Sequence, residues 1–379
     1  MALTPLDFPA SPTVGQLYPD PPVTGQPTYR WDGAQWLSYA AASLPTPTKP
    51  ANYGKKNYII NGAMQVSQEN GATAGTVSGF YPADMFSVSF TGTSGALSTA
   101  NNPTVTPGGS SNRLRVAVTL ADAAVAAGDA VWITTVVEGL RYGDLRFGSA
   151  AAKTITIQFG VRAPAGTYCV ALRNGTADRS YVAEYVIAAG EANTDVMKSV
   201  TLTGDLAGTW AAGNSTSAGV LISWGLMVGG TYQTPAGSWV ASNFMGSSNQ
   251  FNFMGTLSNI FDLFDVSLTE GSVAPPFQVP DYASELALCQ RYYYKASNEP
   301  LGLTASAFSC GGIYPYKVVM RATPAVTGSF NVNSGNAGTF TTLTAPAGPS
   351  TTCVAVYNSA GNWTINAMVA VAIVLNARL

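Results

Sequence analysis

Few residues in this sequence could carry acid–base chemistry. Histidine, the commonest general base and a frequent metal ligand, is absent from the 379 residues. Asp262 and Asp265 are three apart on a predicted strand, so we expect them to face opposite sides. Glycoside hydrolysis needs two carboxylates at a controlled separation, and distant residues can supply them. The candidates for such a pair are Asp122, Asp129, Glu138, Asp144, Asp178 and Glu184. No local spacing favours catalysis or a calcium site, so we expect a protein that is not an enzyme and has no cofactor or metal.

Sugar binding requires fewer specifically placed residues than catalysis does. An exposed aromatic face stacks on a pyranose ring while nearby polar groups fix the hydroxyls. Trp239 has the best local case, because residues 232–244 are dotted with Gly, Ser and Asn and predict a loop. The tentative carbohydrate-binding residues are Trp239, Tyr232, Phe244, Trp210 and Trp363. Further aromatic candidates are Trp132, Tyr142, Tyr314, Tyr316 and Tyr357, with Asn174, Asp178 and Arg179 as polar partners. Core packing is the commoner role of a single aromatic residue, and the sequence does not rank the body against the distal part.

The composition of the chain excludes several classes of protein. Charged residues are only 10% of the chain, against about a quarter in an average domain, and hydrophobic residues reach 46%. A disordered protein is therefore excluded, and so little charge suggests that partner subunits cover much of the surface. The net charge of −2 without a basic block argues against nucleic-acid binding. The longest apolar run, residues 368–375, is too short to cross a bilayer, so no membrane insertion is expected.

The lack of a recognisable secretory signal and the scattered cysteines predict that the chain folds in a cytoplasm. Residues 1–8 show no positive segment followed by an apolar core, so no secretory signal is expected. The four cysteines are widely scattered without a CxxC pair, and we expect them to be buried reduced thiols: Cys169, Cys289, Cys310 and Cys353.

Residues 1–42 predict a small N-terminal unit. Short strand-like runs flank Asp32-Gly33, which is a strong signal for a two-residue hairpin turn between Trp31 and Trp36. These two tryptophans either build a small core or help to anchor the chain to a neighbouring protein. Residues 43–52 alternate proline with small residues and predict an extended linker.

Residues 281–295 predict the one convincing helix. Asp281 is a plausible N-cap, and Arg291 and Lys295 lie in the last turns, where the helix dipole favours positive charge. A helix of about fourteen residues is marginal by itself and needs a packing partner. That partner is either the preceding β-domain or the same helix in other chains. The tentative oligomer-interface stripe is Tyr282, Leu286, Cys289 and Tyr293.

Strand-like runs recur at short intervals through residues 53–279 and predict a β-sandwich or barrel. The predicted strands include residues 114–120, 130–137, 154–161, 167–173, 181–187, 196–202, 220–228 and 261–268. Residues 280–379 predict the helix followed by a small distal β domain. Its last strand, residues 368–375, is apolar on both faces, so neighbouring chains could cover one of them.

A family resemblance emerges from several motifs. The chain begins its body with Asn57-Tyr58-Ile59-Ile60-Asn61-Gly62 and later combines Glu285-Leu286 with Leu288-Cys289-Gln290-Arg291-Tyr292-Tyr293. This pattern resembles bacteriophage and prophage tail-fibre proteins almost continuously over residues 57–295. It departs from them at Glu69 and at Met85-Phe86, where other residue types are common. The resemblance implies a jelly-roll body similar to carbohydrate-binding modules.

The resemblance also implies a function and an assembly. We expect a structural fibre protein of a virion assembled in the cytoplasm of a bacterial host. It is expected to form a homotrimer, to contact other virion proteins through its N-terminus, and to adhere to a host surface glycan by multivalent binding. A head or collar fibre or a decoration protein is the alternative, and a glycan depolymerase is a less favoured one.

Overall fold

The computed structural model describes residues 8–20, 27–39, 57–301, 304–306, 309–332, 353–358 and 369–379. The chain divides into two compact units, Met1–Gly54 and Lys55–Leu379. The predicted linker, residues 43–52, lies outside the described residues, as does Trp363.

The first unit is a three-stranded antiparallel sheet in the order β1 (Leu17–Tyr18), β2 (Thr28–Trp31), β3 (Trp36–Tyr39). Trp31 pairs with Trp36, which confirms the predicted hairpin. The loop holds four residues rather than two, because the Asp32 carboxylate accepts hydrogen bonds from the amides of Ala34 and Gln35, both at 2.8 Å. Phe8 stacks on Trp36 at 5.1 Å, so the tryptophans do form part of a small aromatic core.

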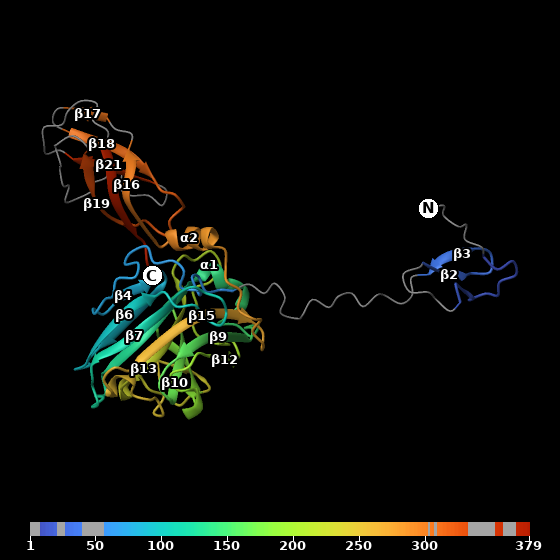
Figure 1. Cartoon of the computed structure of the whole chain (residues 1–379), viewed down its shortest axis with the longest axis horizontal. Helices are drawn as coiled ribbons and strands as arrows, with labels where there is room; N and C mark the ends of the chain where they lie inside the picture. Colours follow the sequence, from blue (N-terminus) through green and yellow to red (C-terminus); the bar gives the residue numbers. More distant parts are fainter. Residues whose placement is uncertain are drawn as a thin grey trace. The chain divides into compact units, whose positions relative to one another are not determined.

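The second unit is built around a sandwich of two antiparallel sheets, as predicted (Figure 1). The larger sheet has the order β14-β11-β10-β13-β8-β5-β4 and the smaller one β12-β9-β15-β7-β6. The chain crosses repeatedly from one sheet to the other, as in jelly rolls. The strands are β4 (Phe80–Ala83), β5 (Phe86–Thr91), β6 (Ala96–Asn102), β7 (Arg113–Leu120), β8 (Ala130–Glu138), β9 (Ile155–Arg162), β10 (Gly166–Asn174), β11 (Arg179–Ile187), β12 (Val196–Leu202), β13 (Ala218–Val228), β14 (Trp239–Ala241) and β15 (Ile260–Glu270).

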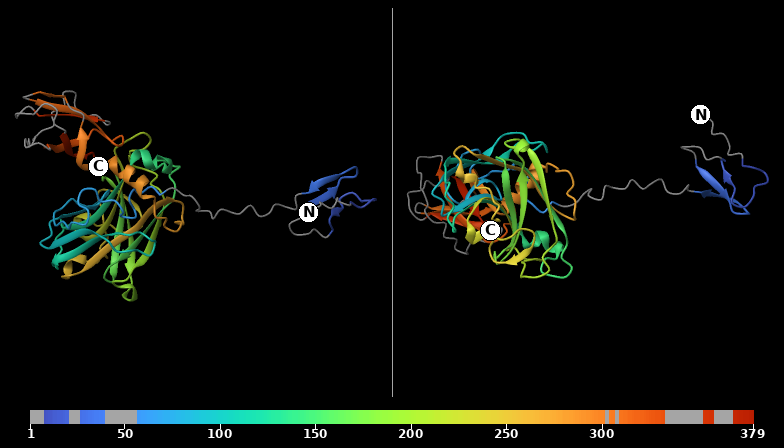
Figure 2. Two further views of the ribbon diagram at one scale, coloured as in Figure 1. Left: turned by 45° about the horizontal axis from the view of Figure 1, so that its top comes forward. Right: turned by 90° about the horizontal axis from the view of Figure 1, so that it is seen from below.

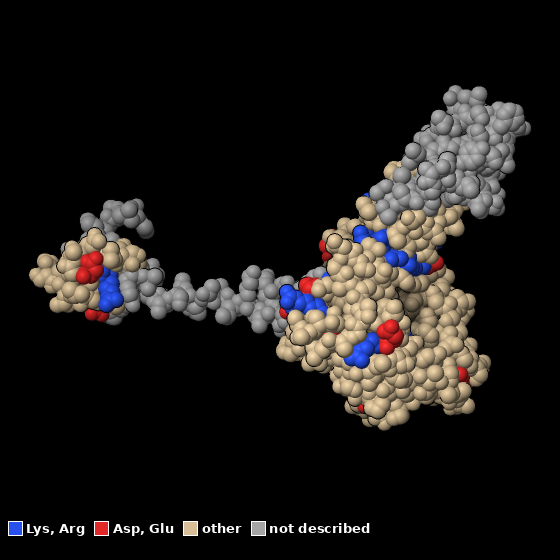
Figure 3. Space-filling view, turned by 180° about the vertical axis from the view of Figure 1, so that it is seen from behind, with Lys and Arg blue, Asp and Glu red and all other residues tan. Residues whose placement is uncertain are grey.

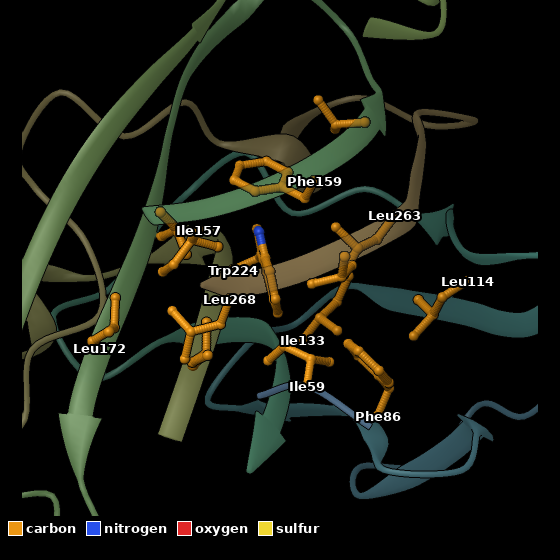
Figure 4. Packing of buried hydrophobic residues seen from close by; sticks show 14 of the residues in the cluster. Ile59, Phe86, Leu114, Ile133, Ile157, Phe159, Leu172, Trp224, Leu263 and Leu268 are labelled. Atoms are coloured by element: carbon orange, nitrogen blue, oxygen red, sulfur yellow. The ribbon is translucent and has the colours of Figure 1, made fainter. Parts of the chain in front are cut away.

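The core lies between the two sheets (Figure 4). Trp224 at its centre is fully buried and packs 5.7 Å from Phe159 of the opposite sheet and 6.4 Å from Phe86. Alternate residues of each strand enter this layer, because successive side chains of a strand point to opposite faces. Strand β13 shows the pattern: Ile222 and Trp224 face the core, while Ser223 between them faces outward.

Strand β15 breaks this alternation. Its core-facing residues are Phe261, Leu263, Val266 and Leu268, so two residues rather than one separate the middle pair. The register against β9 shifts between Phe264 and Ser267, and Asp265 has a left-handed φ of 49°. This β-bulge corrects the expectation that Asp262 and Asp265 face opposite sides, since both lie off the core-facing side.

Helices in the described part of the chain are few and short. Besides α1 (Gly139–Tyr142), single 3-10 turns occur at η1 (Gly143–Leu145), η2 (Ala189–Glu191), η3 (Gly230–Tyr232) and η4 (Phe253–Gly255). The predicted helix is α2 (Tyr282–Gln290), capped by the Asp281 carboxylate at 2.9 Å from the Ser284 amide. It ends five residues earlier than predicted, because Tyr293–Lys295 pair with the last strand of the chain. Among the described residues, no helix has the length and apolarity needed to cross a membrane.

The distal part is also β, as predicted. It holds the sheets β16-β21-β19 and β17-β18-β20, and Figures 1 and 2 show α2 at the end of the sandwich where these strands begin. The strands are β16 (Tyr293–Leu301), β17 (Thr304–Ser306), β18 (Ser309–Pro315), β19 (Ala325–Val332), β20 (Cys353–Asn358) and β21 (Val369–Asn376).

The motif residues behind the family resemblance form a polar framework inside this unit. The Asn61 amide group donates to the backbone oxygens of Val66 and Asp84, both at 2.8 Å, and its backbone N–H donates to Glu285 of α2. Near the end of the helix, the Tyr292 hydroxyl donates to the buried carboxylate of Glu138 at 2.8 Å. These motifs therefore serve to join the start of the body, α2 and the distal part.

Candidate functional site

Four aromatic side chains gather beside the edge strand β14 and form an edge aromatic patch: Phe147, Tyr181, Trp210 and Trp239. Trp239 lies opposite Tyr181 of β11, with ring centroids 5.4 Å apart. Its indole also packs edge-on against Trp210 at 5.4 Å and Phe147 at 5.9 Å. Trp210 and Phe147 are buried, whereas Trp239 and Tyr181 are half-buried. The Trp239 ring thus rests on two buried aromatic rings, and Tyr181 packs beside it.

The local backbone fixes the orientation of Trp239. The sequence predicted a loop here, but residues 239–241 form a short edge strand because β11 supplies backbone partners. The indole Nε1–H of Trp239 donates to the Thr203 carbonyl at 2.9 Å. A buried or half-buried tryptophan commonly satisfies its N–H in this way, and the ring is held in one position.

A charged pair lies next to these rings. Arg179 binds Asp205 through two parallel hydrogen bonds, Nε to Oδ2 at 2.7 Å and Nη2 to Oδ1 at 2.8 Å. Burial by itself raises the pKa of Asp205, but hydrogen bonds from Arg179, the Ala207 amide and Trp210 outweigh it and leave the pKa below its ordinary value. Nη1 of Arg179 has no protein partner in the described part of the chain, and the side chain is 21% exposed. It can therefore donate to a ligand oxygen.

The predicted polar partners divide into two roles. Asn174 is fully buried, and its side-chain oxygen accepts from the amides of Asp178 and Arg179 at 3.0 and 3.1 Å. It therefore shapes the turn that leads into β11 and is not free to bind a ligand. Asp178 is exposed, and its carboxylate accepts a hydrogen bond from Asn174. The structure thus leaves Asp178 and Arg179 for ligand contact.

The predicted aromatic set does not form one site. Trp210 and Trp239 lie together in the edge aromatic patch, whereas Tyr232 and Phe244 lie on the outer face of the larger sheet. Tyr232 packs with Ala130, Val228 and Met245, and Phe244 covers Cys169, Ala171 and Val182. Sequence reasoning missed Tyr181 and Phe147 as members of the patch. The pairing of β11 with β14 brings Tyr181 beside Trp239, and Phe147 reaches Trp239 from the segment after η1.

The predicted helical stripe is only partly open to another chain. Cys289 is 1% exposed and Tyr293 4%, and Leu286 packs against the sandwich core. Burial raises the pKa of the Cys289 thiol well above its ordinary value. Cys289 and Tyr293 are covered by their own chain, which corrects the predicted interface at these two positions. Tyr282, at 53% exposed, remains available to a partner.

The acidic residues considered for hydrolysis serve separate elements. Asp122 binds the turn at Thr93, Asp129 the amide of Ala126, and Glu184 the amide group of Asn249. Glu138 binds Arg291 and Tyr292, and Asp144 accepts from the Tyr58 hydroxyl. Among the described residues, no three Asp, Glu or Cys side chains are grouped to hold a metal ion.

Charge is sparse on the molecular surface. On the face drawn in Figure 3, basic side chains lie mostly beside acidic ones and the remainder is uncharged. Positive charge is not clustered on this face, so an anionic ligand would need a specific cation and not a general positive field.

No family model matches this sequence, and no curated protein matches it. Over 57% of its length the chain is similar in structure to the enzymatically active domain of tailspike protein 4 of bacteriophage CBA120, with 13% identity and a TM-score of 0.30. It covers 21% of that tailspike chain.

Two carbohydrate-binding modules are also similar. One is the family 11 module of a cellulosomal cellulase of Clostridium thermocellum, with 9% identity and a TM-score of 0.26, covering 52% of this chain and 95% of the module. The other is TmCBM61, solved with β-1,4-galactotriose, with 11% identity and a TM-score of 0.27, covering 57% of this chain and 99% of the module. Likenesses this weak carry no conclusion about the ligand of this chain.

Proposed function

We propose that this chain is a structural fibre protein of a bacteriophage virion that adheres to a glycan on the host surface. The sequence resemblance to tail-fibre proteins supports the virion role, and the N-terminal unit with Trp31 and Trp36 is the part proposed to contact other virion proteins. Binding without cleavage is proposed because the acidic side chains serve separate structural elements. Multivalent attachment through several copies would convert weak individual sites into firm adhesion.

One observation carries the glycan-binding part of this proposal. The half-buried rings of Trp239 and Tyr181 lie beside an Arg179–Asp205 pair whose guanidinium retains a free donor among the described residues. An aromatic face and adjacent charged hydrogen-bonding groups are what a pyranose requires, since one face of the sugar is apolar and its rim carries hydroxyls. The buried rings of Phe147 and Trp210 against Trp239 reduce the loss of side-chain entropy on binding.

The test compares variants in binding to purified host surface polysaccharide. Trp239→Ala is expected to weaken binding about tenfold, equivalent to roughly 1.4 kcal/mol, and Asp178→Ala is expected to weaken it without touching the aromatic packing. Tyr232→Ala, on another face, is the matched control and should bind normally. Thermal melting of each variant reports whether the fold is retained. Normal binding by both folded site variants would remove the edge aromatic patch from the proposal.

Catalysis and location need separate measurements. Incubation of the protein with the same polysaccharide should release no new reducing ends, and sustained release would make the protein a depolymerase. A reconstruction of the assembled particle should place the chain on a tail fibre. Its location on the head or collar would favour the alternative of a head fibre or decoration protein.

A further inference from the structure

Arg173 is a buried cation without an anionic partner in the described part of the chain. It lies on β10, and its side chain points to the outer face of the larger sheet, away from the core residues Val170 and Leu172. Only 6% of the residue is exposed. Nη1 donates to the Asn243 side-chain oxygen at 2.6 Å and Nη2 to the Ser223 hydroxyl at 2.7 Å. Its Nε is buried and has no hydrogen-bond partner among the described residues.

Other arginines of the body form ion pairs with carboxylates. Arg115 binds Asp262 at 2.7 Å, Arg179 binds Asp205 at 2.7 Å, and Arg291 binds Glu138 at 3.2 Å. The described partners of Arg173 are neutral oxygens, and Ser223 is itself bonded to the Thr134 hydroxyl at 2.8 Å. Burial lowers the pKa of Arg173 to about 10, which leaves it charged at neutral pH. A buried charge without a counter-ion is unfavourable, so a bound anion would be stabilised there.

The surroundings of Arg173 fit a sugar that carries such an anion. Its direct neighbour across the sheet is Leu221 of β13, which in turn lies opposite Val136 of β8. Both side chains are half-buried. Val136 also lines a small pocket with Arg378 and Leu379, so Leu221 is the apolar side chain that remains beside Arg173 on this face. The planar guanidinium has two used donors out of five, and its fork matches the two oxygens of a carboxylate.

We propose that Arg173, with Ser223 and Asn243 holding its guanidinium, binds the carboxylate of an acidic sugar on the outer face of the larger sheet. The sugar ring would lie over Leu221. This inference rests on the proposed glycan binding and assigns a second site to it, on a different face of the sandwich from the edge aromatic patch. It gives the protein a preference for glycans that contain uronic-acid-type residues.

The first experiment measures binding of sodium glucuronate, methyl glucoside and inorganic phosphate to the full-length protein by calorimetry. Glucuronate is expected to bind at least about tenfold more tightly than methyl glucoside, and more weakly at high salt. Arg173→Gln should abolish this preference. Arg162→Gln is the matched control, because Arg162 also faces outward from a sheet but lies near Asp262, and it should retain the preference. Equal binding of glucuronate by Arg173→Gln overturns the inference, and tighter binding of phosphate assigns the site to phosphorylated glycans instead.

A second measurement covers the case in which Arg173→Gln does not fold. In ¹⁵N-labelled wild-type protein, the Nε–H resonance of Arg173 should shift on addition of glucuronate and not of methyl glucoside. Absence of a shift at saturating glucuronate overturns the inference. The proposed function fails separately, when the wild-type protein binds no host polysaccharide. Suppose that Trp239→Ala removes polysaccharide binding, while Arg173→Gln keeps the preference for glucuronate over methyl glucoside. In that case the proposed function stands and only the site at Arg173 is excluded.

Discussion

Glu285 shows how a motif residue can be structural and ionisable at once. It lies in the first turn of α2, is 9% exposed, and accepts a hydrogen bond from the backbone of Asn61. Burial raises the pKa of Glu285, while the Asn61 hydrogen bond and the charge of Arg141 oppose the rise. The folded protein therefore holds the Glu285 proton more tightly than the unfolded chain does.

This difference predicts a pH dependence with a definite sign. A raised carboxyl pKa contributes stability at low pH that is lost as the pH rises through the folded-state pKa. Glu285→Gln keeps an acceptor for Asn61 but does not ionise, so its stability relative to the wild type should increase from about pH 4 to about pH 7. Urea unfolding at both pH values measures this difference.

Glu191→Gln is a control for which the expected change of stability with pH has the opposite sign. Hydrogen bonds from Lys198 and the Ala188 amide lower the pKa of Glu191, so the stability of this variant relative to the wild type should decrease over the same interval. If the stability of Glu285→Gln relative to the wild type fell with rising pH, that result would contradict the structural account of Glu285.

At the scale of elements, the pairing of β9 with β15 depends on a glycine in β9. Gly160 lies opposite Phe264, whose ring is fully buried and covered by the Arg113 guanidinium at 4.7 Å. A Cβ atom on Gly160 would lie 2.0 Å from Cε2 of that ring. The strand pair therefore has no room for any residue larger than glycine.

We predict that Gly160→Ala destabilises the body by about 1–3 kcal/mol, the usual effect of overpacking. Gly128→Ala is the matched control, because no atom lies within 4 Å of the position that its methyl group would take, and it should change stability by less than about 0.5 kcal/mol. Denaturant midpoints of the two variants give the comparison. Equal midpoints would mean that Phe264 moves aside freely.

At the scale of the whole molecule, the last strand leaves part of its surface uncovered. Ile373 and Leu375 of β21 are 1% and 0% exposed within one chain, whereas Ala372 and Val374 on the other face are half-buried. Val319 and Tyr282 are more than half exposed. Such surface suits contact with other copies, which is the physical part of the homotrimer proposal.

We therefore predict that light scattering of the purified chain gives the mass of a trimer. A variant that lacks residues 1–54 should give a trimer as well, because the half-covered surfaces belong to the second compact unit. A stable, folded monomer in both cases would contradict the homotrimer.

Part of the candidate site was predictable from particular residues. Trp239 and Trp210 were chosen from sequence as carbohydrate-binding residues, with Arg179 and Asp178 as partners, and the structure brings these residues to one edge of the sandwich. Tyr232 and Phe244 were placed with them because they are close in sequence to Trp239. That reasoning failed because the short strand β14 holds Trp239 beside Tyr181 at the sheet edge, whereas Tyr232 and Phe244 both pack on the outer face of the larger sheet.

By itself the sequence determined the sandwich class, the hairpin between Trp31 and Trp36, and the N-cap of α2. Each of these depends on local patterns: alternation of apolar residues, turn residues and a capping carboxylate. Only the tertiary structure decided the end of α2, the bulge in β15 and the burial of Arg173 among neutral partners. These features depend on strand partners and side chains far away in the sequence, such as β21 against Tyr293 and Asn243 against Arg173, which no local pattern encodes.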